Sequence, residues 1–186
     1  TNVMEKILIL GAGSAGTTMA NHLSQKAKKD WEITLVDQFI EHYYQPGFLF
    51  LPFDIYSEKD VFKNRTDYIP KTVKYIQSPI ELINAKEQNV LLENGQYLDY
   101  TLLIIATGSR IAPEEVEGMT GPEWQKSVFD FYTFEGARNL RNFLRTWEGG
   151  KMAIHITEMP IKCPVAPLEF AFLADNYFKK KGIRDQ

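Results

Sequence analysis

The feature that most restricts the fold is a glycine-rich turn, Gly-Ala-Gly-Ser-Ala-Gly at residues 11–16, between two short apolar runs. The run before it, residues 7–10, consists only of Ile and Leu and predicts a strand buried on both faces of a parallel sheet. The run after it, residues 33–36, predicts a second strand. Between them, small and apolar residues recur at helical spacing: Ala15, Met19, Ala20, Leu23 and Ala27. The order strand, tight turn, helix, strand predicts a complete βαβ unit.

The three glycines of this turn have separate expected roles in binding a dinucleotide. Gly11 permits the tight turn, Gly13 lets a pyrophosphate approach the backbone, and Gly16 lets the helix pack closely on the strand. The helix N-terminus would stabilise the phosphate charge. Asp37 ends the second strand 21 residues after Gly16, where a carboxylate accepts hydrogen bonds from ribose hydroxyls and disfavours a 2′-phosphate. The alternative is a glycine turn with a surface aspartate.

The middle of the chain predicts a loop, a short helix and several strands. Residues 38–54 are irregular, aromatic and proline-bearing, and predict a long loop packed against an apolar surface. Ser57 and Asp60 form a capping-box pattern that opens a short helix to about residue 67. Strand-like runs follow at residues 73–77, 80–92 and 102–105, with a hairpin turn at Asn94-Gly95. These runs predict a β-meander added to the parallel sheet.

Two helices and one strand are predicted in the last third. Thr133 is the expected N-cap of a helix that ends at Gly149-Gly150 and whose apolar stripe comprises Ala137, Leu140, Leu144 and Trp147. Residues 152–156 predict a strand. Residues 167–181 predict a helix with Pro167 in its first turn, lysines in its last turn and Gly182 after it.

Composition excludes several classes of function. The 186 residues are 44% hydrophobic and 24% charged, as in ordinary globular proteins, and the net charge of -3 gives no basic face for nucleic acid. One cysteine cannot form an internal disulfide, and three scattered histidines with one cysteine have no metal-ligand spacing. No apolar run approaches the roughly 20 residues of a spanning helix. We expect a cytoplasmic protein that binds neither metal nor nucleic acid.

The run Thr-Leu-Leu-Ile-Ile-Ala-Thr-Gly-Ser at 101–109 resembles the second flavin-contact motif of flavoproteins with two dinucleotide folds. The resemblance implies that FAD, not NAD, occupies the first site, in contact with Ala106, Thr107 and Gly108. A strand that ends in small residues also lets backbone approach a ligand at the carboxyl edge of a sheet. The expected FAD contacts in the first unit are Gly11, Gly13, Ser14, Ala15, Gly16, Asp37 and Gln38.

The stretches His-Tyr-Tyr-Gln-Pro-Gly-Phe-Leu-Phe-Leu-Pro-Phe at 42–53 and Lys-Cys-Pro-Val-Ala-Pro-Leu-Glu-Phe at 162–170 resemble the sulfide:quinone oxidoreductase and flavocytochrome c sulfide dehydrogenase family. With the glycine turn and Asp37, the matching motifs extend in order through nearly the whole chain. The resemblance implies that Gln45 touches the flavin, that the Ile80 backbone meets the adenine, and that Cys163 is one of two redox cysteines. The second cysteine and the membrane-binding helices of the family would lie outside this sequence.

These patterns together predict an α/β protein in three parts. Residues 1–112 would form a Rossmann-like FAD-binding domain with a parallel sheet and the added meander. Residues 113–150 would be a connecting segment with a helix, and residues 151–186 the start of a second Rossmann-like domain that is cut short. We therefore expect the N-terminal portion of a longer protein, which would reach the inner face of the cell membrane through the missing part and could form a homo-oligomer.

The turn around Cys163 differs from a phosphate-binding turn. Residues 157–169 contain no glycine and include Pro160, Pro164 and Pro167, which lack amide donors, so nicotinamide binding is disfavoured here. A nearby helix N-terminus and Lys162 are expected to stabilise the thiolate of Cys163. The hypothesis that follows from the resemblance is that sulfide attacks an oxidised or persulfidated cysteine pair, and that two electrons pass to FAD and then to a quinone.

Several readings stay open at this point. The chain could belong to an NADH:quinone or disulfide reductase, or it could be an FAD-binding module without chemistry of its own, and Cys163 could be an inert buried residue. The aromatic run at 48–53 could line a quinone pocket or pack on its own core. We expect His22 to face solvent and His155 to be a buried or half-buried strand residue.

Overall fold

The computed structural model describes residues 4–186, which form two compact units. Unit 1 extends to Tyr43 and resumes over Phe62–Ser109. Unit 2 comprises Tyr44–Val61 and Arg110–Gln186. The segment 44–61 therefore packs with the second half of the chain, although it lies between two parts of unit 1 in the sequence.

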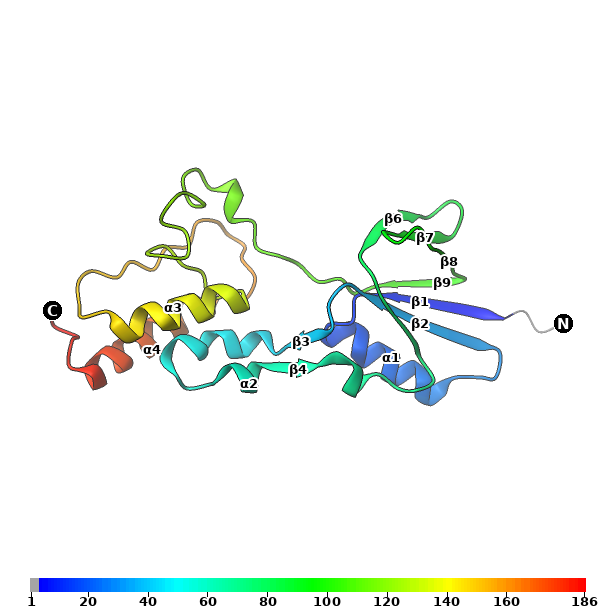
Figure 1. The fold of residues 1–186 in the computed structure, drawn as a ribbon, viewed down its shortest axis with the longest axis horizontal. Coiled ribbons are helices and arrows are strands. Elements are labelled where there is room, and N and C mark those ends of the chain that lie inside the picture. Colours follow the sequence, from blue (N-terminus) through cyan, green and yellow to red (C-terminus); the bar gives the residue numbers. More distant parts are fainter. Residues whose placement is uncertain (1–3) are drawn as a thin grey trace. The chain divides into compact units, whose positions relative to one another are not determined.

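Unit 1 is built on a four-stranded parallel sheet in the order β5-β2-β1-β9, of which Figure 1 labels β1, β2 and β9. Its members are β1 (Glu5–Leu10), β2 (Trp31–Asp37), β5 (Lys74–Gln77) and β9 (Leu102–Ile105). The helix α1 (Ser14–Lys26) connects β1 to β2, so the predicted βαβ unit is confirmed. Ile9, Leu10, Leu35 and Val36 are fully buried, as the continuous apolar runs predicted.

The buried face of α1 differs from the predicted stripe. Gly16 and Ala20 are buried, whereas Ala15 and Met19 are exposed. The reason is the close approach of helix and turn: a Cβ at Gly16 would lie 1.7 Å from the carbonyl oxygen of Gly11. The smallest side chains therefore face the sheet, and the larger Met19 faces solvent.

The predicted meander is present as β6 (Ile80–Asn84), β7 (Asn89–Leu92) and β8 (Tyr97–Asp99), paired antiparallel. The Asn94-Gly95 turn joins β7 to β8, with Gly95 at φ +82° and its amide bonded to the Leu92 carbonyl at 2.9 Å. Val90 and Leu92 are buried in one cluster with Leu8, Leu10 and Val36 of the parallel sheet. The α/β fold with an added meander is thus confirmed.

The helix predicted from Ser57 to about residue 67 is wrong beyond its first turn. The backbone amide and hydroxyl of Ser57 donate to Asp60 at 2.8 and 2.7 Å, but α2 covers only Glu58–Val61. The next residues form β4 (Phe62–Asn64), which pairs antiparallel with β3 (Glu41–Tyr43), and then the 3-10 helix η3 (Arg65–Tyr68). Pairing with a strand some 20 residues away overrides the local helical signal.

Unit 2 is largely helical. Its elements are the 3-10 helices η1 (Gln45–Leu49), η2 (Leu51–Phe53) and η4 (Pro113–Glu115), the short α2, and the longer helices α3 (Phe134–Thr146) and α4 (Ala166–Lys181). Leu49 and Phe53 are buried in one cluster with Leu140 and Leu144 of α3 and Phe170 of α4. The aromatic run at 48–53 therefore packs in the core of its own unit, as one of the two readings expected.

The predicted strand at 152–156 is not formed, and His155 is exposed. A strand is stable only when another strand supplies hydrogen-bond partners, and the part of unit 2 that the structure describes contains no sheet. The predicted helix that follows is present, and Gly182 ends it in the left-handed conformation at φ +74°. Within residues 4–186, no helix combines the length and apolar character that crossing a membrane requires.

Candidate functional sites

The parallel sheet of unit 1 brings most of the predicted cofactor contacts to one edge. Leu10 of β1 is paired with Val36 of β2 and Ile105 of β9, and Asp37 is paired with Gln77 of β5. The four strands thus end at about the same level. The residues that follow these ends include Gly11, Gln38, Ile80 and Ala106. This carboxyl edge is where open α/β sheets bind their ligands.

The glycine turn is shaped by contact with the end of β9. Gly11 has φ +91°, and a Cβ there would lie 2.4 Å from the carbonyl oxygen of Ala106. The Gly11 amide donates to Val36 and the Ala106 amide donates to Leu10, both at 2.7 Å. Only glycine fits this position, because both the dihedral angle and the contact exclude a side chain.

The N-terminus of α1 is open to a ligand. Gly13 is the N-cap with φ -70°, no side chain caps the helix, and a Cβ at Gly13 would meet nothing within 4 Å. Ser14 and Ala15 in the first helical turn are exposed. Free amide groups at a helix start, next to a glycine without a side chain, suit the approach of a pyrophosphate.

Asp37 is held by three protein donors. Its Oδ2 accepts from the Ala12 amide at 2.7 Å and from the Arg65 guanidinium, and its Oδ1 accepts from the Phe39 amide at 2.9 Å. The Tyr75 hydroxyl lies nearby and donates to the Phe39 carbonyl at 2.9 Å. Burial raises the pKa of this phenol; the positive charge of Arg65 lowers it, and the negative charge of Asp37 raises it further. Asp37 thus ends β2 inside a fixed polar network.

Sequence reasoning missed Arg65. No local motif marks it, since it follows the polar residues Lys63 and Asn64 and is separated from Asp37 by 28 residues. Its burial depends on the pairing of β3 with β4, which brings η3 back beside the end of β2. A charged residue in this position is recognised only when the fold is known.

The remaining predicted contacts lie at or beyond the strand ends. Gln38, Thr107 and Gly108 are exposed, Ala106 is half-buried, and Gly108 has φ +71°. Ile80 begins β6, where its backbone is paired with Leu92. The role of each in FAD binding stays a prediction.

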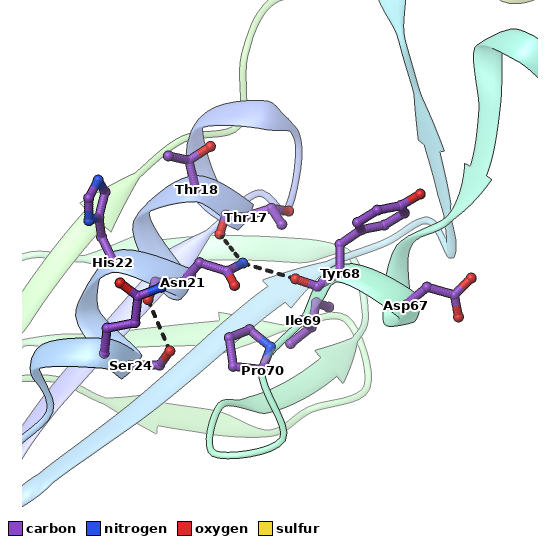
Figure 2. A pocket seen from close by; sticks show the side chains of 10 residues that line it. Thr17, Thr18, Asn21, His22, Ser24, Asp67, Tyr68, Ile69 and Pro70 are labelled. Atoms are coloured by element: carbon purple, nitrogen blue, oxygen red, sulfur yellow. Dashed lines mark hydrogen bonds between the residues drawn. The ribbon is translucent and has the colours of Figure 1, made fainter.

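A separate hollow of about 650 Å³ lies beside α1 in unit 1 (Figure 2). Asn21 on this wall donates to the carbonyl groups of Thr17 and Tyr68, both at 2.9 Å. The hollow is lined by Thr17, Thr18, Asn21, His22, Ser24, Gln25, Asp67, Tyr68, Ile69 and Pro70. None of the predicted cofactor contacts is among them, and His22 is exposed as expected.

Unit 2 carries the second candidate site, the turn that holds Cys163. The thiol residue is exposed and adopts φ +57°, a left-handed conformation that is rare outside glycine and asparagine. Its carbonyl accepts from the Ala166 amide and the Tyr132 hydroxyl, both at 3.1 Å. Cys163 is therefore not the buried residue of the alternative interpretation, and its reactivity stays a prediction.

The surroundings of Cys163 differ in part from expectation. Lys162 donates its ammonium group to Gln45 Oε1 at 2.5 Å, so this cation has a partner other than the thiol. The contact joins the two stretches that carry the family resemblance. Burial, followed by the proximity of Cys163, raises the pKa of the Tyr132 phenol, which keeps this donor protonated at neutral pH. Within residues 4–186, no group of three or more acidic, His or Cys side chains could hold a metal ion.

Together, the parallel sheet, the glycine turn and the carboxylate at the end of β2 define a dinucleotide-binding α/β protein. Residues 5–147 match the family model described as pyridine nucleotide-disulphide oxidoreductase, and the chain belongs to this family. FAD is the cofactor that this membership assigns, in agreement with the expectation from the sequence.

The chain is also similar to sulfide:quinone oxidoreductases over nearly all of its length. It is 30% identical over 182 residues to the mitochondrial enzyme of Dictyostelium discoideum, covering 97% of this chain and 40% of the relative. The corresponding protein of Mus musculus is 24% identical over 179 residues, with 96% and 40% covered. The chain thus spans about 40% of the length of these relatives.

Solved structures support the fold. The sulfide:quinone oxidoreductase of Aquifex aeolicus superposes with a TM-score of 0.76 at 22% identity, covering 97% of this chain and 41% of that one. The match to these relatives over nearly the whole chain confirms the resemblance to this group that the sequence motifs indicated.

Proposed function

We propose that this chain is the FAD-binding part of a flavoenzyme that oxidises sulfide and transfers two electrons through FAD to a quinone. The observation that carries the proposal is the exposed Cys163 in a glycine-free turn, in a chain similar to sulfide:quinone oxidoreductases over 97% of its length. Sulfide and quinone are the compounds in the name of those relatives. A thiol in an accessible turn can act as a nucleophile or as an electrophilic sulfur once oxidised.

The residues of unit 1 fit an FAD molecule at the carboxyl edge of the sheet. The amides at the start of α1 would bind the pyrophosphate, and Asp37 would accept a hydrogen bond from the adenosine ribose. The open space at Gly13 and the exposed first turn of α1 support this assignment. When bound, FAD would supply two-electron acceptor chemistry and then reduce the quinone.

The proposed role of Cys163 follows thiol–disulfide exchange. Hydrosulfide attacks the disulfide between Cys163 and a second cysteine from another part of the protein; the disulfide breaks, a persulfide forms on one sulfur and a thiolate leaves on the other. Joining the persulfide and the thiol into a trisulfide would release two protons and two electrons, for which a bound FAD would be the acceptor. The Cys163 carbonyl accepts hydrogen bonds from Tyr132 and Ala166, and these would hold the backbone of the turn in place during these steps.

Other consequences of the proposal stay predictions. Quinones partition into lipid, so the enzyme would meet its electron acceptor at a membrane surface, and the cytoplasmic location and self-association stay predictions from the sequence. The proline-bearing turn disfavours nicotinamide in unit 2, because Pro160, Pro164 and Pro167 offer no amide donors to a phosphate.

The test is anaerobic reduction of the bound flavin in the full-length protein. Sulfide should bleach the flavin absorbance of the unmodified enzyme, and Cys163→Ser should lower the rate at least about a hundredfold, because the serine hydroxyl cannot form the disulfide. Met159→Leu, in the same exposed loop, is the matched control and should retain the rate.

Three results would contradict the proposal. Sulfide reduction unchanged in Cys163→Ser would remove the role of the thiol. Bleaching by NADH but not by sulfide would favour an NADH:quinone or disulfide reductase. Retention of FAD without bleaching by either compound would indicate a binding module without chemistry.

A further inference from the structure

Arg65 is a buried cation that the dinucleotide motif does not explain. Only 6% of the residue is exposed, and its side chain has two acceptors, the Asp37 carboxylate at the end of β2 and the Glu41 carbonyl in β3. One guanidinium nitrogen donates to Asp37 Oδ2, and the other donates to the carbonyl of Glu41 at 2.5 Å. The backbone amide of Arg65 donates to the Ile40 carbonyl at 2.9 Å. A buried charge persists only when it is paired and hydrogen-bonded, so this arrangement is specific.

The contacts of Arg65 determine which acceptor of Asp37 is free. An ionised carboxylate offers about four acceptor positions on its two oxygens. Oδ2 accepts from Ala12 and Arg65, and Oδ1 accepts from Phe39 alone. The carboxylate side chain is 14% exposed. One acceptor position, on Oδ1, is therefore left for a ligand.

Both oxygens of the carboxylate are held, Oδ2 by two donors and Oδ1 by the Phe39 amide. The Ala12 amide, in the glycine turn, and the Arg65 guanidinium both bind Oδ2, and the planar guanidinium recognises carboxylate with fixed geometry. Arg65 also holds the Glu41 carbonyl, so it fixes the segment that follows Asp37 in addition to the side chain itself.

We infer that Arg65 is the positioning residue of the adenosine-ribose subsite: it binds one oxygen of Asp37 and thereby presents the other to a single ribose hydroxyl of FAD. The inference rests on the FAD site assigned to unit 1 and is independent of sulfide chemistry. The chemical class that this subsite takes is an adenosine with an unmodified ribose. A ligand without the 2′-hydroxyl would lose the hydrogen bond to the Asp37 carboxylate.

The experiment compares two ligands on one protein. FAD and its analogue with 2′-deoxyadenosine are titrated into the apoprotein, and dissociation constants are read from flavin fluorescence. The unmodified protein should prefer FAD by about tenfold or more, the range for a hydrogen bond to a charged group. Asp37→Asn should reduce this preference to about twofold or less.

Arg65→Met is the decisive variant. It should bind FAD more weakly and lose most of the preference between the two ligands, because the carboxylate then keeps only the Ala12 and Phe39 amides and loses the charged donor that occupies Oδ2. A residue with only a structural role would weaken both ligands equally and leave their ratio unchanged. Arg65→Lys keeps the charge without the planar fork and should lower the ratio at least about threefold; it provides the same test if the Met variant does not fold.

The matched control is Arg141 in unit 2. This arginine is also largely buried, donates to Glu58 at 2.5 Å and has an unpaired Nε, as Arg65 has. Arg141→Met should therefore reproduce any general cost of removing a buried ion pair and keep the preference for FAD. An unchanged ratio in both Arg65 variants would overturn the inference, as would the absence of a preference in the unmodified protein. Neither result would affect sulfide-dependent reduction, which tests Cys163.

Discussion

At the scale of single residues, Gly11 and Gly13 carry opposite constraints although they are two positions apart. Gly11 has φ +91° and packs against Ala106, whereas Gly13 has an ordinary φ and open space where a Cβ would be. Gly11 is thus required by the protein itself. Gly13 is required only if a ligand approaches its backbone.

This difference predicts separable effects of the same substitution. Gly11→Ala should lower the free energy of unfolding by about 3 kcal/mol, because the methyl group meets the Ala106 carbonyl and the left-handed backbone is strained. Gly13→Ala should change it by less than about 0.5 kcal/mol, while weakening FAD binding about tenfold, or ~1.4 kcal/mol. Urea unfolding of the apoprotein and FAD titration measure the two quantities.

The control for strain alone is Gly95→Ala, at φ +82° with nothing within 4 Å of its Cβ. Its cost should be about 1 kcal/mol, clearly below that of Gly11→Ala. Normal FAD affinity in Gly13→Ala would argue against a pyrophosphate at this helix start.

Residues also mark the limit of motif reading. The glycine turn and Asp37 could be recognised in the sequence because they are close together and follow a spacing imposed by one βαβ unit. Arg65 could not, since its contact with Asp37 depends on a β-ribbon formed by two distant segments. The hydrogen bond between Lys162 and Gln45 could not be predicted for the same reason, because these residues are 117 positions apart.

At the scale of elements, capping signals located helix starts well. Thr133 caps α3 as predicted, with its hydroxyl accepting from the Gly136 amide at 3.0 Å. Asp130 accepts from the Thr133 amide at 2.7 Å and thus supports the same cap. Of the predicted stripe, Ala137, Leu140 and Leu144 are buried, whereas Trp147 is half-buried and is the C-cap, because α3 ends at Thr146 and not at the predicted Gly149-Gly150.

Removal of this cap should destabilise unit 2. Thr133→Ala is expected to cost about 1–2 kcal/mol, because an amide of the first turn loses its acceptor and Asp130 loses the hydroxyl partner. Thr146→Ala, at the other end of α3, should cost less than about 0.5 kcal/mol, because its hydroxyl only donates to a carbonyl in an exposed turn. Thermal unfolding of both variants is the measurement, and equal losses would contradict the capping role.

Two elements were predicted wrongly because their structure depends on a partner strand elsewhere in the chain. The strand predicted at 152–156 has the right alternation but no sheet in the described part of unit 2 to join. The helix predicted to continue to residue 67 gives way to β4, because its residues pair with β3. Periodicity describes the residues of one segment and contains no information about whether a partner strand is present.

At the scale of the whole molecule, the chain consists of two units with different predicted tasks. Unit 1 carries most of the predicted FAD contacts at the edge of its parallel sheet, and unit 2 carries the predicted flavin contact Gln45 and the predicted redox residue Cys163. Binding of FAD should therefore slow the hydrogen exchange of specific amides in unit 1, and this can be measured without catalytic turnover.

Hydrogen exchange should show this protection. With FAD at about 100 times its dissociation constant, exchange of the Gly11, Ala12 and Ala106 amides should slow by up to about a hundredfold, since bound ligand suppresses opening of this edge. The Gly95 amide, at the hairpin tip of the same unit, should change far less because it opens locally. Equal protection at Gly95 and Ala12, or none at either, would contradict the assigned edge.

The sequence by itself determined the βαβ unit, the glycine turn, the meander and the starts of α3 and α4. Each of these is encoded in a few consecutive residues through periodicity, capping and the dihedral freedom of glycine. Only the tertiary structure decided that segment 44–61 packs in unit 2, that Arg65 holds Asp37, and that residues 152–156 form no strand. These outcomes depend on contacts between distant segments, whose free energy is gained only after the chain has brought them together.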